Sequence, residues 1–414
     1  WVNASSIMDP GVGYIVRAPN GFSNTVNQNW VVNFNNGVPN NGVYSPVISR
    51  GDNLNSGAVS SSGITLTDTD DNWNLIGNPY PSSIGVNAFL NANSEIDGFV
   101  RVWSHSTLPT ALNSSSFYNN FNSNYSASDY ITINGAGSTS GPGTLSVIGG
   151  GQSFFVLMNS GSAANSTVTF NNSMRDKTFS NSQFYRTSNI ENDFENHRIW
   201  LDLVSTTETS RTLISYNDRA TNGRDRLYDA LTNYRNNQNI YSLLENNPMV
   251  IQGKALPFSE EDVVKIGVKV PSNGQYSIAI GALDGLFANQ NIFIKDNVNN
   301  VVHDLKSSPY SFTAVAGILN NRFEIIYKPT VLSAEDFTSN NLTVYVESKI
   351  INVVSSTEDI EEINVFDVLG RKLYENISIN NKTFSIPLLN TNNQTLILKV
   401  KFKNGQVYTH KIIL

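Results

Sequence analysis

Short runs in which apolar and polar residues alternate dominate the chain after residue 195. A period of two is typical of a strand with one buried face, and it predicts six strands before residue 330. The Asn- and Gly-containing segments 271–275 and 296–300 separate neighbouring runs and predict hairpins. Residues 85–93 have the clearest helical spacing. The six predicted strands are 198–204, 211–216, 263–270, 276–283, 291–296 and 322–328.

The last 80 residues repeat this pattern more densely, with predicted strands at 341–348, 362–375, 382–388, 395–403 and 406–414. In one of them the alternation predicts Leu396, Leu398, Val400 and Phe402 on one face and Lys399, Lys401 and Lys403 on the other. The final strand would place Tyr408, His410, Ile412 and Leu414 on one face. We therefore expect the end of the chain to belong to a hydrophobic core.

Composition divides the chain of 414 residues into parts. Before residue 175 the only basic residues are Arg17, Arg50 and Arg101, and the first lysine is Lys177. Residues 11–19 and 29–37 resemble 150–159 and 166–174, which indicates an internal repeat. We expect an all-β fold of consecutive antiparallel β-sandwich domains. The predicted domains are an Asn- and Gly-rich β domain at 1–174, truncated at its start, a jelly-roll-like sandwich at 175–335, and a small Ig-like domain at 336–414.

Charge and motifs exclude several classes of function. A net charge of −7 and a pI of 5.2 disfavour nucleic acid as a partner, and no apolar run approaches the roughly 20 residues of a transmembrane helix. The chain has no cysteine, none of its four histidines has metal-motif spacing, and no G-x-S-x-G or phosphate-loop motif is present. These features predict a protein that is not an enzyme and has no cofactor, with calcium as the one candidate metal.

Two acidic stretches are candidate calcium sites, because hard carboxylate oxygens suit this ion. One contains Asp68, Asp70 and Asp71, and the other contains Asp225 and Asp229. The favoured alternative for the first is a solvated turn before a strand. The favoured alternative for the second, within residues 217–229, is an ion-paired loop that folds across the sandwich.

Prolines on both sides of Tyr80 predict a rigid loop, because proline fixes the backbone. Tyr80 in one orientation, with Trp73 and Trp103 nearby, could hold a sugar ring. The favoured alternative is that Tyr80 closes the end of its own sandwich.

The C-terminal pattern resembles the C-terminal sorting domain of cargo proteins of the type IX secretion system of Bacteroidota, in a variant similar to type C. The resemblance is carried by a D-x-x-G-R motif after a strand and by a closing hairpin that ends in K-I-I-L. The matching residues are Asp367, Gly370, Arg371, Gly405, Lys411, Ile412, Ile413 and Leu414. Upstream segments such as 74–84 also resemble adhesin-like flavobacterial surface proteins.

The resemblance implies a secreted or outer-membrane surface protein that passes through the periplasm. Its implied partners are the translocon barrel and the outer-membrane shuttle and attachment proteins. The secretion machinery could recognise the positive charge of Lys399, Lys401 and Lys403. Alternatively, these lysines could serve only to prevent edge-to-edge aggregation of the sheet. The upstream part would be an adhesin. The alternative is a carbohydrate-binding accessory region of a polysaccharide-degrading enzyme, with surface polysaccharide as partner.

Overall fold

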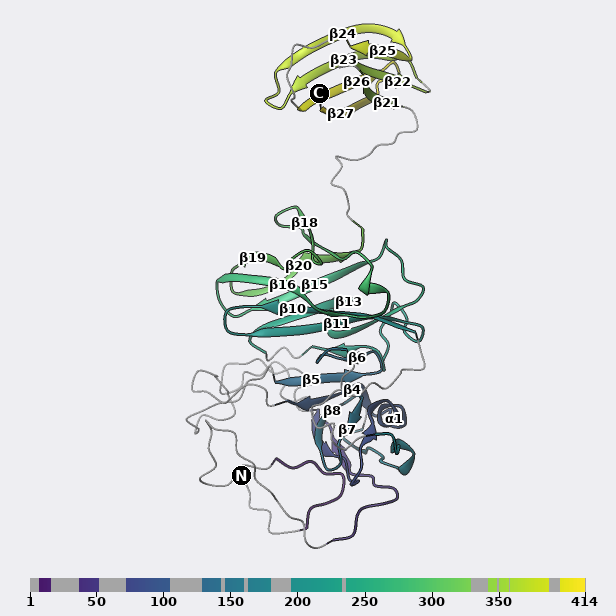
Figure 1. Ribbon diagram of the computed structural model, residues 1–414, viewed down its shortest axis with the longest axis vertical. Helices are drawn as coiled ribbons and strands as arrows, with labels where there is room; N and C mark the ends of the chain where they lie inside the picture. Colours follow the sequence, from purple (N-terminus) through teal and green to yellow (C-terminus); the bar gives the residue numbers. More distant parts are fainter. Residues whose placement is uncertain are drawn as a thin grey trace. The chain divides into compact units, whose positions relative to one another are not determined.

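The computed structural model forms two compact units, Trp1–Pro329 and Thr330–Leu414, and is built almost entirely of β-strands (Figure 1). The all-β prediction is therefore confirmed. The structure describes residues 7–15, 37–51, 72–104, 129–142, 146–159, 163–179, 195–232, 236–328, 342–347, 350–356, 358–386 and 395–413. Much of the first copy of the predicted internal repeat lies outside these residues.

The first half of unit 1 is built on a five-stranded antiparallel sheet with the strand order β2-β8-β4-β5-β6. Two short pairs, β1 with β9 and β3 with β7, flank it, and η1 (Asn172–Met174) follows. The strands are β1 (Val47–Ser49), β2 (Trp73–Gly77), β3 (Ile84–Gly85), β4 (Ile96–Trp103), β5 (Tyr130–Asn134), β6 (Gly137–Ser138), β7 (Val147–Ile148), β8 (Ser153–Met158) and β9 (Asn165–Thr167).

Helix α1 (Val86–Ala92) confirms the predicted helix. Val86, Phe89 and Leu90 are buried at helical spacing, and Phe89 stacks on Phe170 with ring centroids 5.0 Å apart. Seven residues are too few for a stable isolated helix, so α1 depends on this packing. The opposite face presents Asn87 and Asn91 to solvent.

The second half of unit 1 is one large sheet with the order β18-β17-β20-β15-β13-β14-β11-β10-β16-β19, and β12 pairs with β14. All neighbours are antiparallel except β11 and β14. The strands are β10 (Asn196–Val204), β11 (Thr209–Asn217), β12 (Ala230–Leu231), β13 (Asn239–Leu244), β14 (Asn247–Ala255), β15 (Val263–Val270), β16 (Gly274–Leu283), β17 (Phe293–Asp296), β18 (Val301–Asp304), β19 (Tyr310–Ala314) and β20 (Gly317–Ile326). A 3-10 turn, η3 (Gly285–Ala288), follows β16.

This sheet curls so that its two ends pack face to face. The ring centroid of Phe312 in β19, at one end of the sheet, lies 4.7 Å from that of Phe323 in β20, near the other end. The β17–β18 hairpin over 296–300 is confirmed. The hairpin predicted over 271–275 is wrong, because β15 pairs with β13 and β20 while β16 pairs with β10 and β19. Residues 271–275 therefore connect β15 and β16, two strands that do not pair with each other.

The two halves of unit 1 have separate cores, one on each side of residue 175. A third cluster, which includes Phe99, Leu157, Trp200, Leu213 and Ile251, joins them. The indole of Trp200 donates to the Ser138 carbonyl oxygen at 2.7 Å. The structure therefore differs from the predicted division into domains at 1–174 and 175–335, since both belong to one compact unit.

Unit 2 is a small sandwich of two antiparallel sheets, β21-β22-β25 and β24-β23-β26-β27, around one core. Leu396, Leu398, Val400 and Phe402 are buried, as the alternation predicts. Its strands are β21 (Leu342–Glu347), β22 (Ile350–Ser355), β23 (Ile360–Asp367), β24 (Lys372–Asn381), β25 (Thr383–Ile386), β26 (Thr395–Phe402) and β27 (Val407–Ile413).

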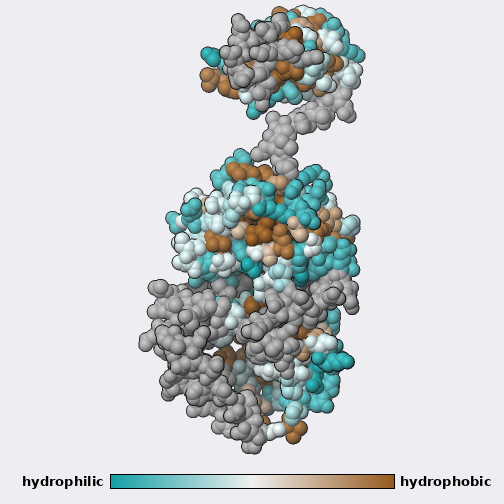
Figure 2. Space-filling view, in the orientation of Figure 1, coloured by the Kyte–Doolittle hydropathy of each residue, from teal (hydrophilic) through white to brown (hydrophobic). Residues whose placement is uncertain are grey.

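The last described strand, β27, lies at the edge of its sheet. Ile412, His410 and Tyr408 lie opposite the core residues Leu396, Leu398 and Val400, so they share one face as predicted. On this edge strand Ile412 is buried, Tyr408 is half-buried and His410 is exposed. Figure 2 shows mostly hydrophilic and intermediate surface on unit 1 with some apolar patches. Exposed apolar side chains in its second half include Val298, Val315 and Ile318.

Candidate functional site

Residues 218–229, called here the crossing loop, leave β11 and reach across to the first half of unit 1. Short polar side chains shape the loop by accepting its backbone N–H groups, and one of these bonds forms an ST turn. The Asp229 carboxylate accepts the Asp225 N–H at 2.6 Å, and the Thr221 hydroxyl accepts the Gly223 N–H at 3.2 Å. The loop therefore has a defined conformation of its own.

Two arginines attach the crossing loop to the first half. Arg226 donates to the carbonyl oxygens of Leu90 at 3.0 Å and Ile96 at 3.1 Å, so its guanidinium links the last turn of α1 to the start of β4. Arg224 forms an ion pair with Asp97 at 2.9 Å. The predicted ion-paired loop is confirmed, but the loop crosses between the halves of unit 1.

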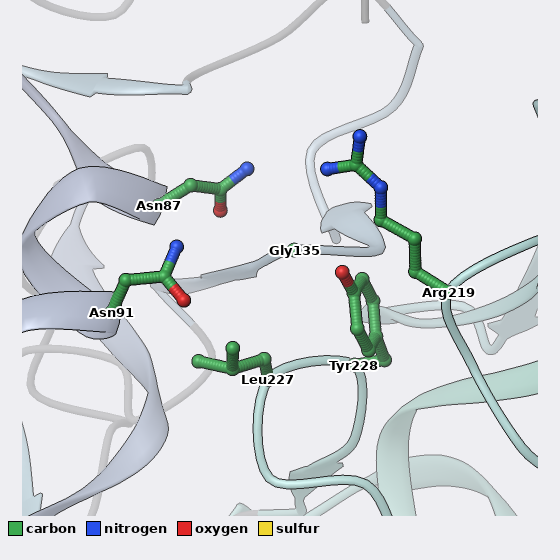
Figure 3. A pocket seen from close by; sticks show the side chains of 6 residues that line it. All are labelled: Asn87, Asn91, Gly135, Arg219, Leu227 and Tyr228. Atoms are coloured by element: carbon green, nitrogen blue, oxygen red, sulfur yellow. The ribbon is translucent and has the colours of Figure 1, made fainter. Parts of the chain in front are cut away.

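A small cleft of about 50 Å³ lies where α1 faces the crossing loop (Figure 3). Asn87 and Asn91 project into it from one face of α1, because residues four apart on a helix are neighbours. Leu227, Tyr228 and Arg219 lie on the opposite side. None of the six residues that line the cleft is acidic.

Gly135, between β5 and β6, closes the remaining side of the cleft. Its N–H donates to the Leu227 carbonyl oxygen at 2.8 Å. A Cβ at this position would lie 2.8 Å from that oxygen and 2.9 Å from Cε1 of Tyr228. The close approach of the two backbones therefore depends on glycine.

The Tyr228 phenol is half-buried beside the cleft. Burial raises its pKa, while the charge of Arg219 and a hydrogen bond from that guanidinium act in the opposite direction. Because the net shift is upward, the phenol is protonated at neutral pH and keeps a proton to donate.

Asp229 is fully buried and serves the backbone. One carboxylate oxygen accepts the Asp225 N–H and the other accepts the Gly253 N–H at 2.9 Å. This arrangement uses both oxygens, so the geometry does not support Asp225 and Asp229 as a calcium site. Within the described ranges no cluster of three or more potential ligands is present. Asp68, Asp70 and Asp71 lie outside them.

Burial raises the pKa of Asp229 to about 6, although the hydrogen bonds from Asp225 and Gly253 lower it. Since the native state then holds this proton more tightly than the unfolded state, unit 1 should lose stability as pH rises from about 4 to about 6. The expected loss is up to ~3 kcal/mol from this group. Urea unfolding across this pH range should show a smaller loss in Asp229→Asn. Parallel pH curves for the two proteins would contradict the assignment.

Trp73, Tyr80 and Trp103 do not form the predicted aromatic site. Tyr80 is 1% exposed and donates to the Gly42 carbonyl oxygen at 2.6 Å, so the alternative, that it closes its own sheet, fits the structure. Trp73 begins β2 and Trp103 ends β4. Because both strands run antiparallel to β8, the two indoles lie at opposite ends of the sheet.

Trp73 instead shields a buried arginine. The Arg101 guanidinium lies 4.5 Å from the Trp73 ring centroid and donates to the Leu231 carbonyl oxygen at 2.8 Å. Burial lowers the pKa of Arg101 to about 10. Trp73 therefore contributes to the contact between the two halves of unit 1.

In unit 2 the D-x-x-G-R residues form the tight turn between β23 and β24. The buried Asp367 carboxylate accepts the backbone N–H groups of Leu369 and Arg371, both at 2.9 Å, and Nε of Arg371 at 2.6 Å. Gly370 has a φ of +80°, where glycine is favoured. Burial raises the pKa of Asp367, but the hydrogen bonds from Arg371 and Leu369 outweigh it and hold that pKa below its usual value.

The basic face of β26 is partly neutralised. Lys401 pairs with Glu361 at 2.8 Å and Lys403 with Asp359 at 3.6 Å, while Lys399 is exposed. Gly405, with a φ of +83°, occupies the β26–β27 turn, and Lys411 is exposed on β27. Ile413 is the last residue of β27, and Leu414 lies outside the described residues.

The cleft was not predicted from the sequence. Its available signals are the i, i+4 spacing of Asn87 and Asn91 and the basic composition of residues 219–226. Neither pattern indicates that the two segments meet, because 127 residues separate Asp97 from its partner Arg224.

Together these features define an all-β protein with a two-core unit that carries a polar cleft and a separate small sandwich. A model of the family described as "Domain of unknown function (DUF8693)" matches residues 1–327, most of the chain, and the chain belongs to this family. A second model, "Domain of unknown function (DUF8694)", matches residues 332–414. The two matches follow the two compact units closely.

Comparison with curated proteins gives no match. Among solved structures, Tp47, the 47-kilodalton lipoprotein of Treponema pallidum, is 9% identical, with 53% of this chain and 87% of that chain covered and a TM-score of 0.16. The central fibronectin-III array of RIM-binding protein is 11% identical, with 91% and 98% covered and a TM-score of 0.14. At these TM-scores neither likeness indicates a shared fold. No helix among the described residues is long and apolar enough to cross a membrane.

Proposed function

We propose that this chain is a secreted or cell-surface protein with an adhesin-like role, exported by a type IX secretion system that recognises residues 330–414 as a folded signal. The observation that carries the proposal is the D-x-x-G-R turn on a compact unit of its own. A folded signal needs a fold independent of its cargo, and the separation at residue 330 supports that requirement.

The turn between β23 and β24 offers a rigid surface for recognition. Asp367, Gly370 and Arg371 hold the backbone, and Val368 and Leu369 at its tip are 66% and 77% exposed. Apolar side chains held in one conformation lose little entropy on binding. The tip and the Arg371 guanidinium are therefore the favoured contacts for the translocation partners.

The export experiment compares the 414-residue chain with a chain that ends at Pro329, in a Bacteroidota host with a type IX system. We expect the full chain at the surface or in the medium and the shortened chain in the periplasm. A fusion of residues 330–414 to an unrelated periplasmic reporter provides the positive control. Surface delivery of the shortened chain, or retention of the fusion, would remove the proposal.

The role of the basic face needs a separate comparison within this experiment. Lys399, Lys401 and Lys403 are changed together to glutamine, and the matched control is Asp359→Asn with Glu361→Gln. Both variants break the same two exposed ion pairs, which contribute little to stability, but only the first removes the positive charges. If the translocation partners recognise the positive charges, export should fall in the lysine variant and stay at the wild-type level in the acidic control variant.

A further inference from the structure

From the cleft between α1 and the crossing loop we infer a binding site for the edge of a neutral saccharide. The residues that carry this inference belong to unit 1 alone, and it is independent of the export route. They are Asn87, Asn91, Arg219, Leu227 and Tyr228.

The hydrogen-bonding groups in the cleft match those of sugar hydroxyls. A hydroxyl both donates and accepts, and so does each Asn amide group. Asn87 and Asn91 lie on exposed positions of one helix face, and neither side chain forms a hydrogen bond with another described residue. Two amides one helical turn apart can therefore bind two hydroxyls of one ring.

The opposite side of the cleft supplies a donor and an apolar surface. The Tyr228 hydroxyl accepts from Arg219, and its own proton remains for a ligand oxygen. Leu227 and the Tyr228 ring present carbon surface of the kind that packs against the C–H face of a sugar. With no carboxylate in the lining, the site favours an uncharged ligand over a metal ion.

The volume limits what the cleft can hold. Each water-sized group needs roughly 10–15 Å³ of such space, so a cleft of about 50 Å³ accepts about three to five groups. This corresponds to one edge of a pyranose ring with adjacent hydroxyls. Because Asn87 and Asn91 are exposed, the rest of a longer chain would lie in solvent.

The test measures binding of neutral sugars to the full chain by saturation-transfer NMR. The sugars are glucose, galactose, mannose and N-acetylglucosamine. Titration to roughly 50 mM detects the millimolar affinity expected of so small a contact. We expect at least one sugar to bind. The double variant Asn87→Ala, Asn91→Ala should weaken binding at least tenfold, and Tyr228→Phe should weaken it several-fold.

The controls separate lost contacts from lost folding. Alanine is the best helix former, so the double variant should melt at or above the wild-type temperature. Asn289→Ala, which removes an exposed amide outside the cleft, should bind as wild type. Absence of binding by every sugar, or binding that the double variant leaves unchanged, would overturn the inference. So would binding of inorganic phosphate alone that is abolished by Arg219→Gln, because the cleft would then be an anion site.

Discussion

The Gly98→Ala variant is expected to lose a substantial part of the stability of unit 1. A Cβ at residue 98 would lie 1.6 Å from the carbonyl oxygen of Arg226 and 2.3 Å from its carbonyl carbon. Both are backbone atoms of a loop held by several hydrogen bonds, so no side-chain rotation relieves the overlap. Overpacking of this kind costs ~3 kcal/mol or more, a large part of the usual 5–15 kcal/mol.

Calorimetry of the full chain provides the measurement for Gly98→Ala. The transition of unit 1 should move to lower temperature, and that of unit 2 should stay in place. Gly223→Ala is the matched control, because it lies in the crossing loop and its nearest neighbour would be the Thr221 hydroxyl at 3.7 Å. If the two variants melt alike, the crossing loop does not hold the two halves of unit 1 together.

The Phe402→Ala variant is expected to unfold unit 2. Phe402 is 2% exposed in the hydrophobic core formed by the described residues of this unit and packs edge-on against Tyr408, with ring centroids 5.2 Å apart. Truncation of a buried phenylalanine costs ~3–5 kcal/mol. This is comparable to the free energy of unfolding of a marginally stable small domain. Near-UV circular dichroism and calorimetry should show the loss of the second transition alone.

Lys403→Ala is the matched control for Phe402→Ala. It changes the next residue, which faces solvent and whose ion pair with Asp359 is well exposed, so its melting should stay near wild type. Under the proposed function, Phe402→Ala should also be retained in the periplasm while Lys403→Ala is exported. Export of a chain whose unit 2 is shown to be unfolded would contradict recognition of a folded signal.

Local patterns were sufficient to locate the helix and about half of the described strands. Alternation identified β10, β11, β15 and β16, and it placed Leu398 and Val400 in the core of unit 2, because each side chain chooses its face within its own strand. β13 and β14 were missed, since their polar positions, such as Asn239 and Gln252, are themselves buried.

Partner choice between strands could not be predicted in this way. Residues 271–275 have turn composition, but whether β15 then pairs with β16 depends on layers formed by distant segments. The same holds for the cleft. Asn87 and Tyr228 become neighbours only through Arg226, Gly98 and Gly135, and no local pattern reports such a contact.

The pairing of β10 with β16 has a consequence for the time course of folding. Ile199 lies opposite Leu283, and Val263 lies opposite Ile326. Contacts between such distant residues require closure of long loops before any burial compensates the lost entropy, and they place a domain among the slow folders, at milliseconds to seconds. The large sheet of unit 1 also cannot be completed until β20 has been synthesised. The second half of unit 1 should therefore complete its fold only after residue 326 has been synthesised, whereas the core of the first half is formed by residues 48–174.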